Sequence, residues 1–493
     1  MDELDILDGG SYLSAMDSRL YGGGGIGCYS LRILRQYIYL AACNSFEVEL
    51  SGEIGLPTNR ISSSRPRIPS WLGKYHRQVI KQVINLITSI PSCLYEPSTW
   101  IRNSAVIVTG GLGYVGSHVC SRLLCKGYTV LIIDNLTNSF DSVVRDIRLT
   151  LEASDMGFLA SKKMIHLPID YGNAISLSQA LVSYSRNLQI IGAIHLAASK
   201  SVSESLENPG KYYENNVIKM ESFLRVLGKH GVHNVIFSSS ATVYGSLPSE
   251  MASKALNEDM VPIVGPDVPM QGIAKTMAGL TPYGISKVLG EAMIKKFVEG
   301  HSRRRGMVFR LFNPVGCDPS GYLKENPRDN HWCGGGIMQM IRKAVVDDTV
   351  FQVFGGGGDE GDGSCIRDFV HVGDIARGIV MGFESCLHME GNGGRCRVYN
   401  LASGKGVSVK QLLKEVEETI GLVLKVEKCK KREGDLPISI GDVEKVKKEL
   451  GWVPEMGVQD LCRDFCRANG IGKDAGEEPV HVSGLIRSIS ESL

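Results

Sequence analysis

A tyrosine and a lysine four positions apart form the clearest chemical pair in this sequence. They occur in the run Tyr283-Gly-Ile-Ser-Lys287, directly after Pro282, a residue that favours the first turn of a helix. Positions i and i+4 share a helix face, so the phenol and the ammonium would point into one site. A phenol with a pKa near ~10 is a poor base at neutral pH, but a neighbouring cation stabilises the phenolate. The pair therefore predicts a proton-transferring tyrosine with a lowered pKa; the alternative is an ordinary pair on a helix surface.

A run of hydroxyl residues upstream could share that proton. The run Phe237-Ser-Ser-Ser-Ala-Thr-Val-Tyr-Gly245 follows an apolar segment that indicates a strand. Parallel sheets bind ligands at the carboxyl ends of their strands. Ser240 or Thr242 could there hydrogen-bond a substrate hydroxyl and share its proton with Tyr283. Serines that only cap the end of a strand are the alternative.

A glycine-rich turn earlier in the chain has the context of a dinucleotide site. The apolar run Ala105–Val108 indicates a buried strand, glycines follow at Gly110, Gly113 and Gly116, and Val119–Leu124 has helical spacing. The first glycine would make the tight turn, the second would let the backbone approach a pyrophosphate, and the third would let helix and strand pack closely. The helix N-terminus would offer its N–H groups to the phosphates.

The segment after this helix completes the pattern. Thr129–Ile133 is a second apolar strand that ends at Asp134. A carboxylate there accepts hydrogen bonds from an adenosine ribose and repels a 2′-phosphate, which favours NAD over NADP. The unit predicts an NAD site, and an ordinary glycine-containing turn is the alternative. The positive ring of a bound nicotinamide would add to the effect of Lys287 on Tyr283.

Strands and helices alternate from residue 101 onward. Continuous apolar runs, typical of strands covered by helices on both faces, recur at Ala105–Val108, Val130–Ile133, Ile191–Leu196, Val235–Phe237 and Val308–Leu311. Amphipathic segments such as that of Met220, Phe223, Leu224 and Leu227 separate them. We expect a doubly wound parallel α/β sheet of the Rossmann type over 101–310. A smaller α/β substrate domain, with segments that return to the sheet, should occupy 311–470.

The two ends of the chain differ from this pattern. Residues 1–100 contain the run Gly22–Gly25, a linker-like stretch at Ser62–Ser70 and little strand signal. They predict a partly disordered N-terminal extension with helices over Leu31–Ala42 and Tyr75–Ile90. Residues 471–493 are expected to form a C-terminal tail.

Composition limits the partners and the compartment. The chain has 493 residues, 43% hydrophobic and 22% charged, with a formal net charge of +1, which gives no electrostatic reason to expect nucleic acid or a membrane surface. Its 13 cysteines are scattered without metal-ligand spacing, so we expect reduced thiols, no metal and a cytoplasmic location. The acidic start is unlike a signal peptide, and no run approaches the roughly 18 apolar residues of a spanning helix.

Several segments, taken in order over about 104–465, resemble the UDP-glucose 4-epimerase (UDP-galactose 4-epimerase) family of extended short-chain dehydrogenases/reductases. The matching segments are Thr109–His118, Asp134–Ser139, His195–Ser205, Tyr212–Asn216, the serine run, Tyr283 with Lys287, Phe312–Gly316, Arg367–His371 and Arg432–Pro437. The resemblance implies interconversion of UDP-glucose and UDP-galactose, in galactose metabolism, by reversible hydride transfer between sugar C4 and a resident NAD. It also implies a homodimer formed through helices of the nucleotide domain.

The resemblance assigns residues to each part of NAD. The glycine turn and the Asp134 loop would contact the pyrophosphate and ribose, and Asp170 and Tyr171 would flank the adenine. Lys287 would bond the nicotinamide ribose and depress the pKa of Tyr283. The cofactor residues so implied are Gly110, Gly113, Tyr114, Val115, Gly116, Asp134, Asn135, Asn138, Ser139, Asp170, Tyr171, Leu196, Ala197, Ala198, Lys200, Asn216, Ser238, Tyr283, Lys287 and Phe312.

The resemblance likewise assigns a UDP-sugar site. Ser240 and Tyr283 would hold the sugar O4. Arg367 and Arg432 would neutralise the diphosphate, which suits arginine because its planar fork bonds phosphate oxygens bidentately; each alone could also be a solvated surface charge. The further substrate contacts implied are Asn313, Gly336, Asp435 and Ser439.

The sequence departs from the family pattern in a few places. An insertion at about 250–280 lies near the expected active-site mouth, where it could act as a lid. Gly336 stands where the family has an asparagine and loses a side-chain contact to the nucleotide, while Leu311 replaces an aromatic residue. Ser439 stands where the family has either a tyrosine or a small residue. The small side chain leaves space for an N-acetyl group, so UDP-GlcNAc and UDP-GalNAc are expected as additional substrates.

Two other functions are compatible with the same pattern. A nucleotide-sugar dehydratase or decarboxylase would need an added acid and base beside the serine, but Ala241 and Thr242 stand there. A catalytically inactive sensor of NAD or nucleotide sugar would not need Tyr283, Lys287 and Ser240. We therefore expect the epimerase.

Overall fold

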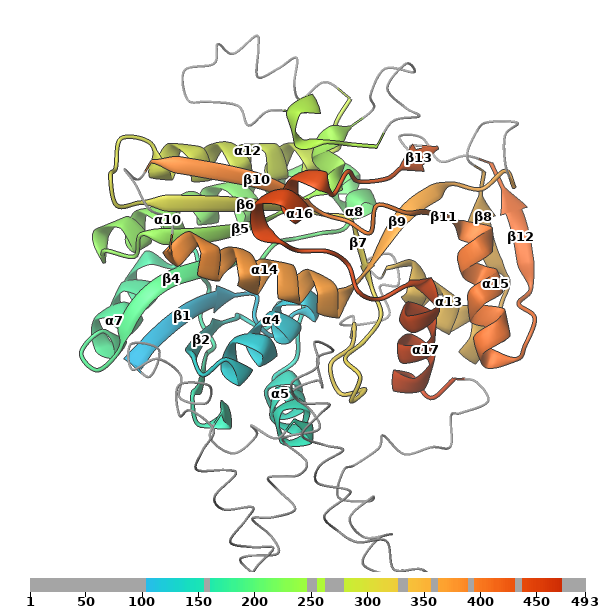
Figure 1. Cartoon of the computed structure of the whole chain (residues 1–493), viewed down its shortest axis with the longest axis horizontal. Helices are drawn as coiled ribbons and strands as arrows, with labels where there is room; N and C mark the ends of the chain where they lie inside the picture. Colours follow the sequence, from blue (N-terminus) through green and yellow to red (C-terminus); the bar gives the residue numbers. More distant parts are fainter. Residues whose placement is uncertain are drawn as a thin grey trace, which may run out of the picture. The chain divides into compact units, whose positions relative to one another are not determined.

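A parallel sheet with the strand order β10-β6-β5-β4-β1-β2-β3 forms the centre of the fold (Figure 1). In the computed structural model these strands are β1 (Ser104–Thr109), β2 (Thr129–Ile133), β3 (Met164–Leu167), β4 (Gln189–His195), β5 (Asn234–Ser240), β6 (Arg305–Leu311) and β10 (Arg395–Leu401). The chain runs outward in both directions from β1, so the predicted doubly wound α/β fold is confirmed. Ligands of such folds bind where the strand order reverses, here beside the carboxyl ends of β1 and β4.

The structure describes residues 103–154, 160–245, 255–261, 279–326, 336–355, 362–388, 394–430 and 437–471. They belong to the compact unit Pro97–Leu493. Several predictions lie outside them, namely the helices expected in residues 1–100, most of the 250–280 insertion, Arg432, Asp435 and nearly all of the tail.

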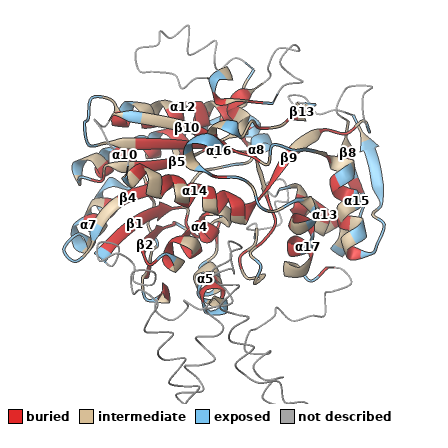
Figure 2. Cartoon of the chain, viewed as in Figure 1, coloured by how far each residue is buried: buried red, intermediate tan, exposed pale blue. Residues whose placement is uncertain are grey.

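Alternate residues of each strand supply two separate cores. Val106 and Val108 of β1 belong to one core, and Ala105 and Ile107 belong to the other, because successive strand residues point to opposite faces. Buried residues accordingly run the length of the central strands (Figure 2). The helices that cover the two faces are α4 (Tyr114–Cys125), α5 (Ser142–Ala153), α7 (Ala174–Tyr184), α10 (Lys219–Lys229), α12 (Pro282–Val298) and α14 (Val372–Leu387).

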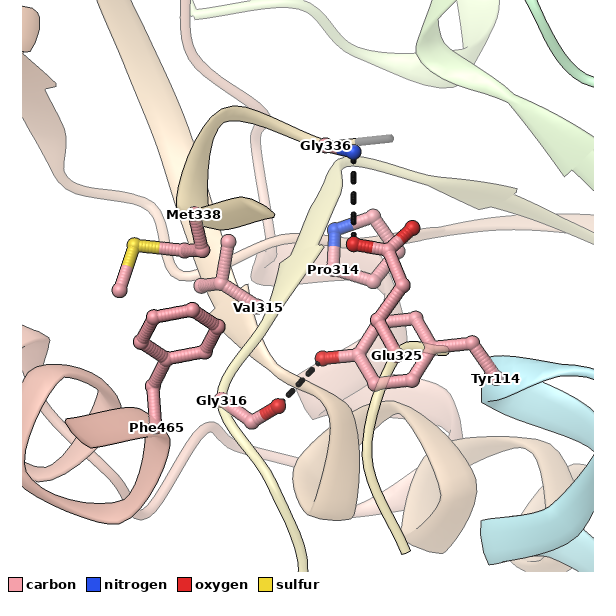
Figure 3. Close-up of a pocket in the computed structure, with 8 residues that line it drawn as sticks. All are labelled: Tyr114, Pro314, Val315, Gly316, Glu325, Gly336, Met338 and Phe465. Carbon is pink, nitrogen blue, oxygen red and sulfur yellow. Dashed lines mark hydrogen bonds between the residues drawn. The ribbon is translucent and has the colours of Figure 1, made fainter. Parts of the chain in front are cut away.

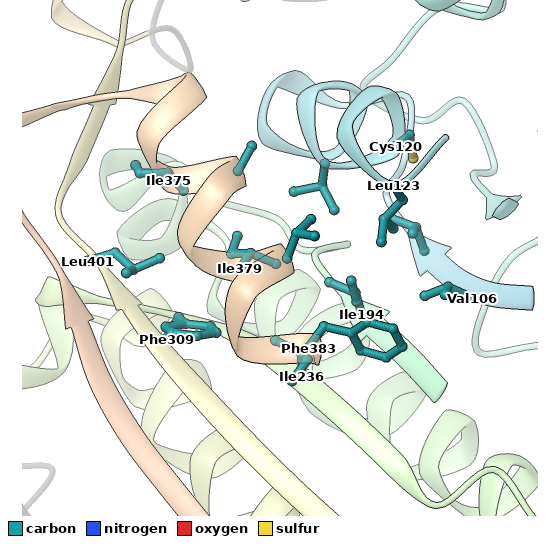
Figure 4. Packing of buried hydrophobic residues seen from close by; sticks show 14 of the residues in the cluster. Val106, Cys120, Leu123, Ile194, Ile236, Phe309, Ile375, Ile379, Phe383 and Leu401 are labelled. Carbon is teal, nitrogen blue, oxygen red and sulfur yellow. The ribbon is translucent and has the colours of Figure 1, made fainter. Parts of the chain in front are cut away.

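Two elements of this sheet layer come from beyond residue 311. Strand β10 pairs with β6 along its whole length, and α14 lays Ile375, Ile379 and Phe383 over the central strands (Figure 4). Helix α14 approaches closely because Gly382 faces Phe309; a Cβ on that glycine would lie 2.3 Å from the ring. The range 311–470 therefore supplies both the edge of the large sheet and a smaller part beside it.

The smaller part has a core of its own. Strands β7 (Asn313–Val315), β9 (Ile366–His371), β11 (Gly406–Ser408) and β13 (Ile438–Ser439) form one sheet, and β8 (Phe351–Phe354) pairs with β12 (Val426–Cys429). Helices α13 (Ile337–Val346), α15 (Val409–Ile420), α16 (Glu444–Leu450) and α17 (Val458–Ala468) complete it. Strand β7 follows β6 almost at once, so the carboxyl end of the large sheet leads directly into the small one.

Two further features of the described residues are the state of the cysteine thiols and the apolarity of the helices. The nine cysteines found there carry free thiols, including Cys462 and Cys466 of α17, which are both buried. Within the same residues, no helix combines the length and the apolarity that crossing a membrane would require.

Candidate active site

The glycine turn between β1 and α4 is too tight for side chains. Gly110 has φ +67°, and a Cβ there would lie 2.8 Å from the Cα of Ala197 on the next loop. A Cβ on Gly116 would lie 2.0 Å from the carbonyl oxygen of Gly110, a contact that no side chain can make. Helix α4 begins after Gly113 without a side-chain cap from any described residue. Its first N–H groups are therefore available to an anion, as a pyrophosphate site requires.

The Asp134 carboxylate is held in place by the turn on one side and its own loop on the other. Its Oδ2 accepts from the Leu112 backbone N–H at 3.0 Å. Its Oδ1 accepts from the Leu136 N–H at 3.0 Å and from the Ser139 hydroxyl at 2.7 Å. A carboxylate oxygen can accept two donors, so Oδ2 still has capacity for a ribose hydroxyl. Among the other loop residues, Asn135 and Asn138 are exposed, whereas Ser139 is buried.

Asp170 and Tyr171 behave differently from one another. Asp170 accepts from Lys219 Nζ at 2.6 Å and from Asn135 Nδ2 at 3.1 Å. Burial raises the pKa of Asp170, but the hydrogen bonds from Lys219 and Gly172 outweigh it and leave the pKa lowered. The Tyr171 ring instead packs in the core against His195 and Phe223. The prediction that Asp170 and Tyr171 flank the adenine therefore concerns the Asp170 side chain and the Tyr171 backbone.

Asn216 joins the cofactor side to the catalytic helix. It lies in a short π-helix, η3 (Glu214–Ile218), a distortion that is frequent at functional sites. Its Oδ1 accepts from the Ser199 N–H at 2.9 Å, and its Nδ2 donates to the Ser199 carbonyl and to the Ser286 hydroxyl at 3.0 Å each. The loop Leu196–Lys200, which follows β4, is thereby fixed beside α12. Ser199 and Ser286 were not singled out from the sequence, although both lie within its motifs.

The predicted catalytic residues meet at the start of α12. The Thr281 hydroxyl caps this helix by accepting from the Gly284 N–H at 3.2 Å. Tyr283 and Lys287 are 9% and 4% exposed. Lys287 Nζ donates to the Ser238 carbonyl of β5 at 2.8 Å and lies 5.7 Å from the centre of the Tyr283 ring. The Ser240 hydroxyl is near enough to the Tyr283 phenol to lower its pKa, so the three residues form one cluster.

A second hydroxyl residue lies in an element that packs against α12. Thr242 lies in the short helix η4 (Ala241–Tyr244), which is capped by Ser240. Its Oγ1 is buried and has no hydrogen-bond partner in the part of the chain that the structure describes. A buried hydroxyl without a partner is costly, and a substrate hydroxyl would satisfy it. The structure therefore keeps both Ser240 and Thr242 as candidates for holding a sugar hydroxyl.

Burial has the largest effect on the pKa values of Tyr283 and Lys287. Burial raises the pKa of Tyr283 to about 12, and the Ser240 hydroxyl acts in the opposite direction. Burial lowers the pKa of Lys287 to about 8, although Glu291 raises it. The prediction of a lowered tyrosine pKa is therefore wrong for the protein chain by itself, because removal of the phenol from water outweighs the effect of its neighbours. A lowered value needs a further positive charge, as a bound nicotinamide would supply.

The small sheet supplies the predicted diphosphate side. Asn313 Nδ2 donates to the Asp368 carbonyl at 2.8 Å, which fixes β7 to β9. Arg367 on β9 is in register with Ser439 on β13, and Ser439 is 9% exposed. Phe312, just before β7, is 1% exposed and packs near the Tyr244 ring at 6.3 Å. Arg432 and Asp435, the other predicted substrate contacts, lie outside the described residues.

A glutamate that the sequence did not single out links the two sides. Glu325 accepts from Lys200 Nζ at 2.7 Å and from the Gly336 N–H, at the start of α13, at 3.3 Å. Beside it the Tyr114 hydroxyl donates to the Gly316 carbonyl at 2.7 Å, and these residues line a small pocket with Met338 and Phe465 (Figure 3). Glu325 thus contacts Lys200 and Gly336 and lines the same pocket as Tyr114 and Gly336.

The site as a whole can transfer a proton in a dry setting beside two anion-binding surfaces. Most described cofactor residues follow the carboxyl ends of strands of the large sheet, and the others lie on η3 and α12. Several of the described substrate residues lie in the small sheet, on β7, β9 and β13, and at the start of α13. Ser240 lies at the end of β5, and Tyr283 and Lys287 lie in the first turns of α12. This arrangement suits a substrate that carries both a hydroxyl to be deprotonated and a diphosphate.

Comparisons with known proteins give the same picture. The sequence model of the NAD dependent epimerase/dehydratase family matches residues 106–402. A UDP-glucose 4-epimerase of Cyamopsis tetragonoloba is 32% identical over 368 residues, covering 74% of this chain and 95% of the relative. The crystal structure of UDP-glucose 4-epimerase from Bifidobacterium longum, in complex with NAD+ and UDP, has 30% identity and a TM-score of 0.61 and covers 74% and 97% of the two chains. The enzyme from Stenotrophomonas maltophila, with bound NAD and formylated UDP-arabinopyranose, has 27% identity and a TM-score of 0.62 and covers 79% and 99%.

The glycine turn gives a direct test of dinucleotide binding. Gly116→Ala should weaken NAD binding by at least tenfold, about 1.4 kcal/mol, because the new Cβ forces the turn away from the helix. The measurement is the NAD released when the purified protein is denatured, together with its melting temperature. Gly210→Ala is the matched control, since a Cβ at Gly210 meets no atom within 4 Å. A folded Gly116→Ala protein that carries as much NAD as the control would contradict the assignment.

Proposed function

Because this chain belongs to the NAD dependent epimerase/dehydratase family, we propose that it interconverts UDP-glucose and UDP-galactose with a tightly held NAD, as an enzyme of galactose metabolism. The observation that carries the proposal is the buried cluster of Tyr283, Lys287 and Ser240 at the end of β5. A glycine turn shaped for a pyrophosphate lies on one side of the cluster and a small sheet bearing Arg367 on the other. The UDP-glucose 4-epimerases found among the relatives support this choice of substrate.

The residues present suit NAD. The Gly116 position admits no side chain, α4 begins without a side-chain cap from the described residues, and Asp134 Oδ2 can take a further donor. When bound, NAD would accept a hydride from sugar C4 and return it. The residues that would hold it are those of the glycine turn, Asp134, the Leu196–Lys200 loop, Asn216 and Lys287. Their contribution is orientation and charge.

The protein's own chemistry concerns the proton on the sugar O4. Tyr283 would take this proton and later return it, and Ser240 and Thr242 would hold the oxygen in reach. Lys287 supplies the positive charge beside the phenol, and burial excludes water, which would screen that charge. Firm binding of the diphosphate by Arg367 and its neighbours would leave the sugar ring free to present either face. Inversion at C4 requires the sugar ring to turn over while the nucleotide stays bound, and loose binding of the sugar would allow this.

The rival functions need groups that this site lacks or would not need. A dehydratase or decarboxylase needs a further acid and base, whereas Ala241 and Thr242 follow Ser240 in η4. A sensor without catalysis would not need Lys287 buried against the Ser238 carbonyl at 2.8 Å. Burial of an ammonium is costly, so its presence favours a catalytic use.

We also propose that the protein works in the cytoplasm as a homodimer. Four large apolar residues lie exposed on the consecutive helices α8 (Val202–Glu207), α9 (Pro209–Tyr213) and η3, next to the catalytic helix. They are Val202, Leu206, Tyr213 and Ile218, with exposures of 40%, 62%, 54% and 40%. Clustered apolar side chains at a surface commonly mark a protein interface, and a second copy of the chain would cover them.

The base is tested by Tyr283→Phe. With UDP-galactose as substrate and no added NAD, the wild-type protein should form UDP-glucose, and the variant should lose roughly 10²–10⁴-fold in kcat while retaining its bound dinucleotide. Tyr128→Phe is the control, since Tyr128 is also a buried tyrosine and lies just before β2, where its hydroxyl contacts Glu384 at 3.4 Å. Full activity of the Tyr283→Phe protein would reject this base.

Ser439 tests the choice of sugar. Wild-type protein should act on UDP-GlcNAc as well as UDP-glucose, because the serine leaves space at the sugar C2 substituent. Ser439→Tyr should lower kcat/KM for UDP-GlcNAc by about 10²-fold, the scale of discrimination that pocket size can give. Its kcat/KM for UDP-galactose should stay unchanged. The initial rates with both substrates decide it, and equal turnover of both by the variant would disprove the assignment.

The dimer is tested at Leu206. Leu206→Glu places a charge in the proposed interface and should yield a monomer by light scattering, at a protein concentration where the wild type is a dimer. Val423→Glu is the control, because Val423 is 89% exposed near the end of α15, away from α8. A dimeric Leu206→Glu protein would place the contact elsewhere.

A further inference from the structure

A buried ion pair lies one helical turn beyond Lys287. Glu291 on α12 is 2% exposed and Arg310 on β6 is fully buried. Arg310 donates to the Glu291 carboxylate twice, from Nε at 3.0 Å and from Nη2 at 2.8 Å. Buried charges are costly unless they are paired with good geometry, and this bidentate pair meets that condition.

The same carboxylate holds the strand that carries the catalytic groups. The Ser239 hydroxyl donates to Glu291 Oε1 at 2.5 Å. Ser239 stands between Ser238, whose carbonyl accepts from Lys287 Nζ, and Ser240, whose hydroxyl meets Tyr283. A displacement of Ser239 would therefore move both neighbours, because they share its backbone.

We propose that Glu291 is a positioning residue for the reaction: it fixes the end of β5 under Tyr283 and Lys287 and places a negative charge one helical turn from the Lys287 ammonium. The inference rests on the proposed function, since it concerns the same tyrosine and lysine. Arg310 offsets the cost of burying the carboxylate, while Glu291 is the charged neighbour that raises the pKa of Lys287.

The surroundings of Lys287 make its charge depend on Glu291. Burial lowers the pKa of Lys287, and Glu291 raises it. On β4, burial lowers the pKa of His195 to about 3, with Lys287 acting in the same direction, so this imidazole is neutral beside the lysine. From β5 come the Phe237 ring, 5.0 Å from Nζ, and the Ser238 carbonyl. On α12 the other titratable neighbour is Tyr283, whose pKa is raised by burial.

Several other groups surround the ion pair of Glu291 and Arg310. Arg310 lies over the Tyr244 ring of η4 at 5.0 Å, and it donates to the carbonyls of Glu258 and Val261 at 3.2 and 2.5 Å. The Glu258 carboxylate accepts from the Asn400 N–H on β10 at 2.7 Å. The Cys396 thiol of β10 has its pKa raised by burial, with Glu291 adding to the effect. Arg310 thus also ties the segment 255–261, from the family-divergent insertion, to the catalytic layer.

The test replaces the pair without leaving a lone charge. In the full chain, Glu291→Gln combined with Arg310→Met should lower kcat, leave KM for UDP-galactose nearly unchanged, and move the alkaline limb of the kcat profile down by about one pH unit. The direction follows because Lys287 must carry its proton, and without Glu291 the lysine loses it at lower pH. Glu299→Gln is the matched control at the residue that follows α12, where Glu299 meets Lys295 at 3.9 Å near the surface; its profile should equal that of the wild type.

A second measurement needs no catalysis. The pKa of Lys287 in the folded chain is about 8, below that of an unfolded lysine at ~10.4, so the charged lysine destabilises the fold and stability recovers as pH rises through the folded pKa. The difference in melting temperature between each protein and its Lys287→Met derivative, measured from pH 6 to 10, should therefore change at lower pH in the double variant than in the wild type.

The outcomes separate the two proposals. A wild-type protein that forms no UDP-glucose overturns the proposed function, while the melting experiment still reports on Glu291. An active wild type with a double variant of unchanged profile and unchanged melting difference overturns the role of Glu291. If the double variant does not fold, Ser239→Ala decides, since it removes only the hydrogen bond at 2.5 Å: the role predicts a several-fold lower kcat, and an unchanged kcat overturns it.

Discussion

The structure depends on keeping a phenol and an ammonium together away from water. Burial favours the neutral form of each group, which moves the pKa of Tyr283 up to about 12 and that of Lys287 down to about 8. Neither group is useful in that form, because a base must be able to lose its proton and a lysine must carry its charge. The surrounding contacts work against this tendency. The Ser240 hydroxyl lowers the pKa of the phenol, and the Ser238 carbonyl and Glu291 favour the charged lysine.

The catalytic helix connects the parts of the site. Its first turn holds Tyr283 and Lys287, Ser286 bonds Asn216 of the π-helix, and Glu291 bonds Arg310 and Ser239 of two neighbouring strands. On the other side, Glu325 joins Lys200 to the start of α13. Contacts therefore run without a break from the loop after β4, through α12, to the sheet edge. This continuity explains how a nucleotide fold and a small sheet from distant parts of the sequence can form one site.

Local pattern was enough to predict the large sheet, the glycine turn and the Tyr283–Lys287 pair. A strand, a tight turn or a helix face depends on residues close in sequence, so spacing reveals it. The ion pair of Glu291 and Arg310 and the contact of Lys200 with Glu325 join residues 19 and 125 positions apart, and no local spacing marks them. The place of α14 and β10 in the main layer and the inward turn of Tyr171 are likewise tertiary. The tyrosine pKa was mispredicted for the same reason, since the extent of burial belongs to the whole fold.

Burial holds the Tyr283 phenol in its neutral form, and the positive charge of a bound NAD+ is expected to lower its pKa. A tyrosinate absorbance titration tests this, taken as the difference between the wild type and Tyr283→Phe, with and without NAD+. We expect a midpoint near 12 in the protein stripped of dinucleotide and a clearly lower midpoint once NAD+ is added. A midpoint at the ordinary value of ~10 in the stripped protein, or no movement on addition of NAD+, would contradict it.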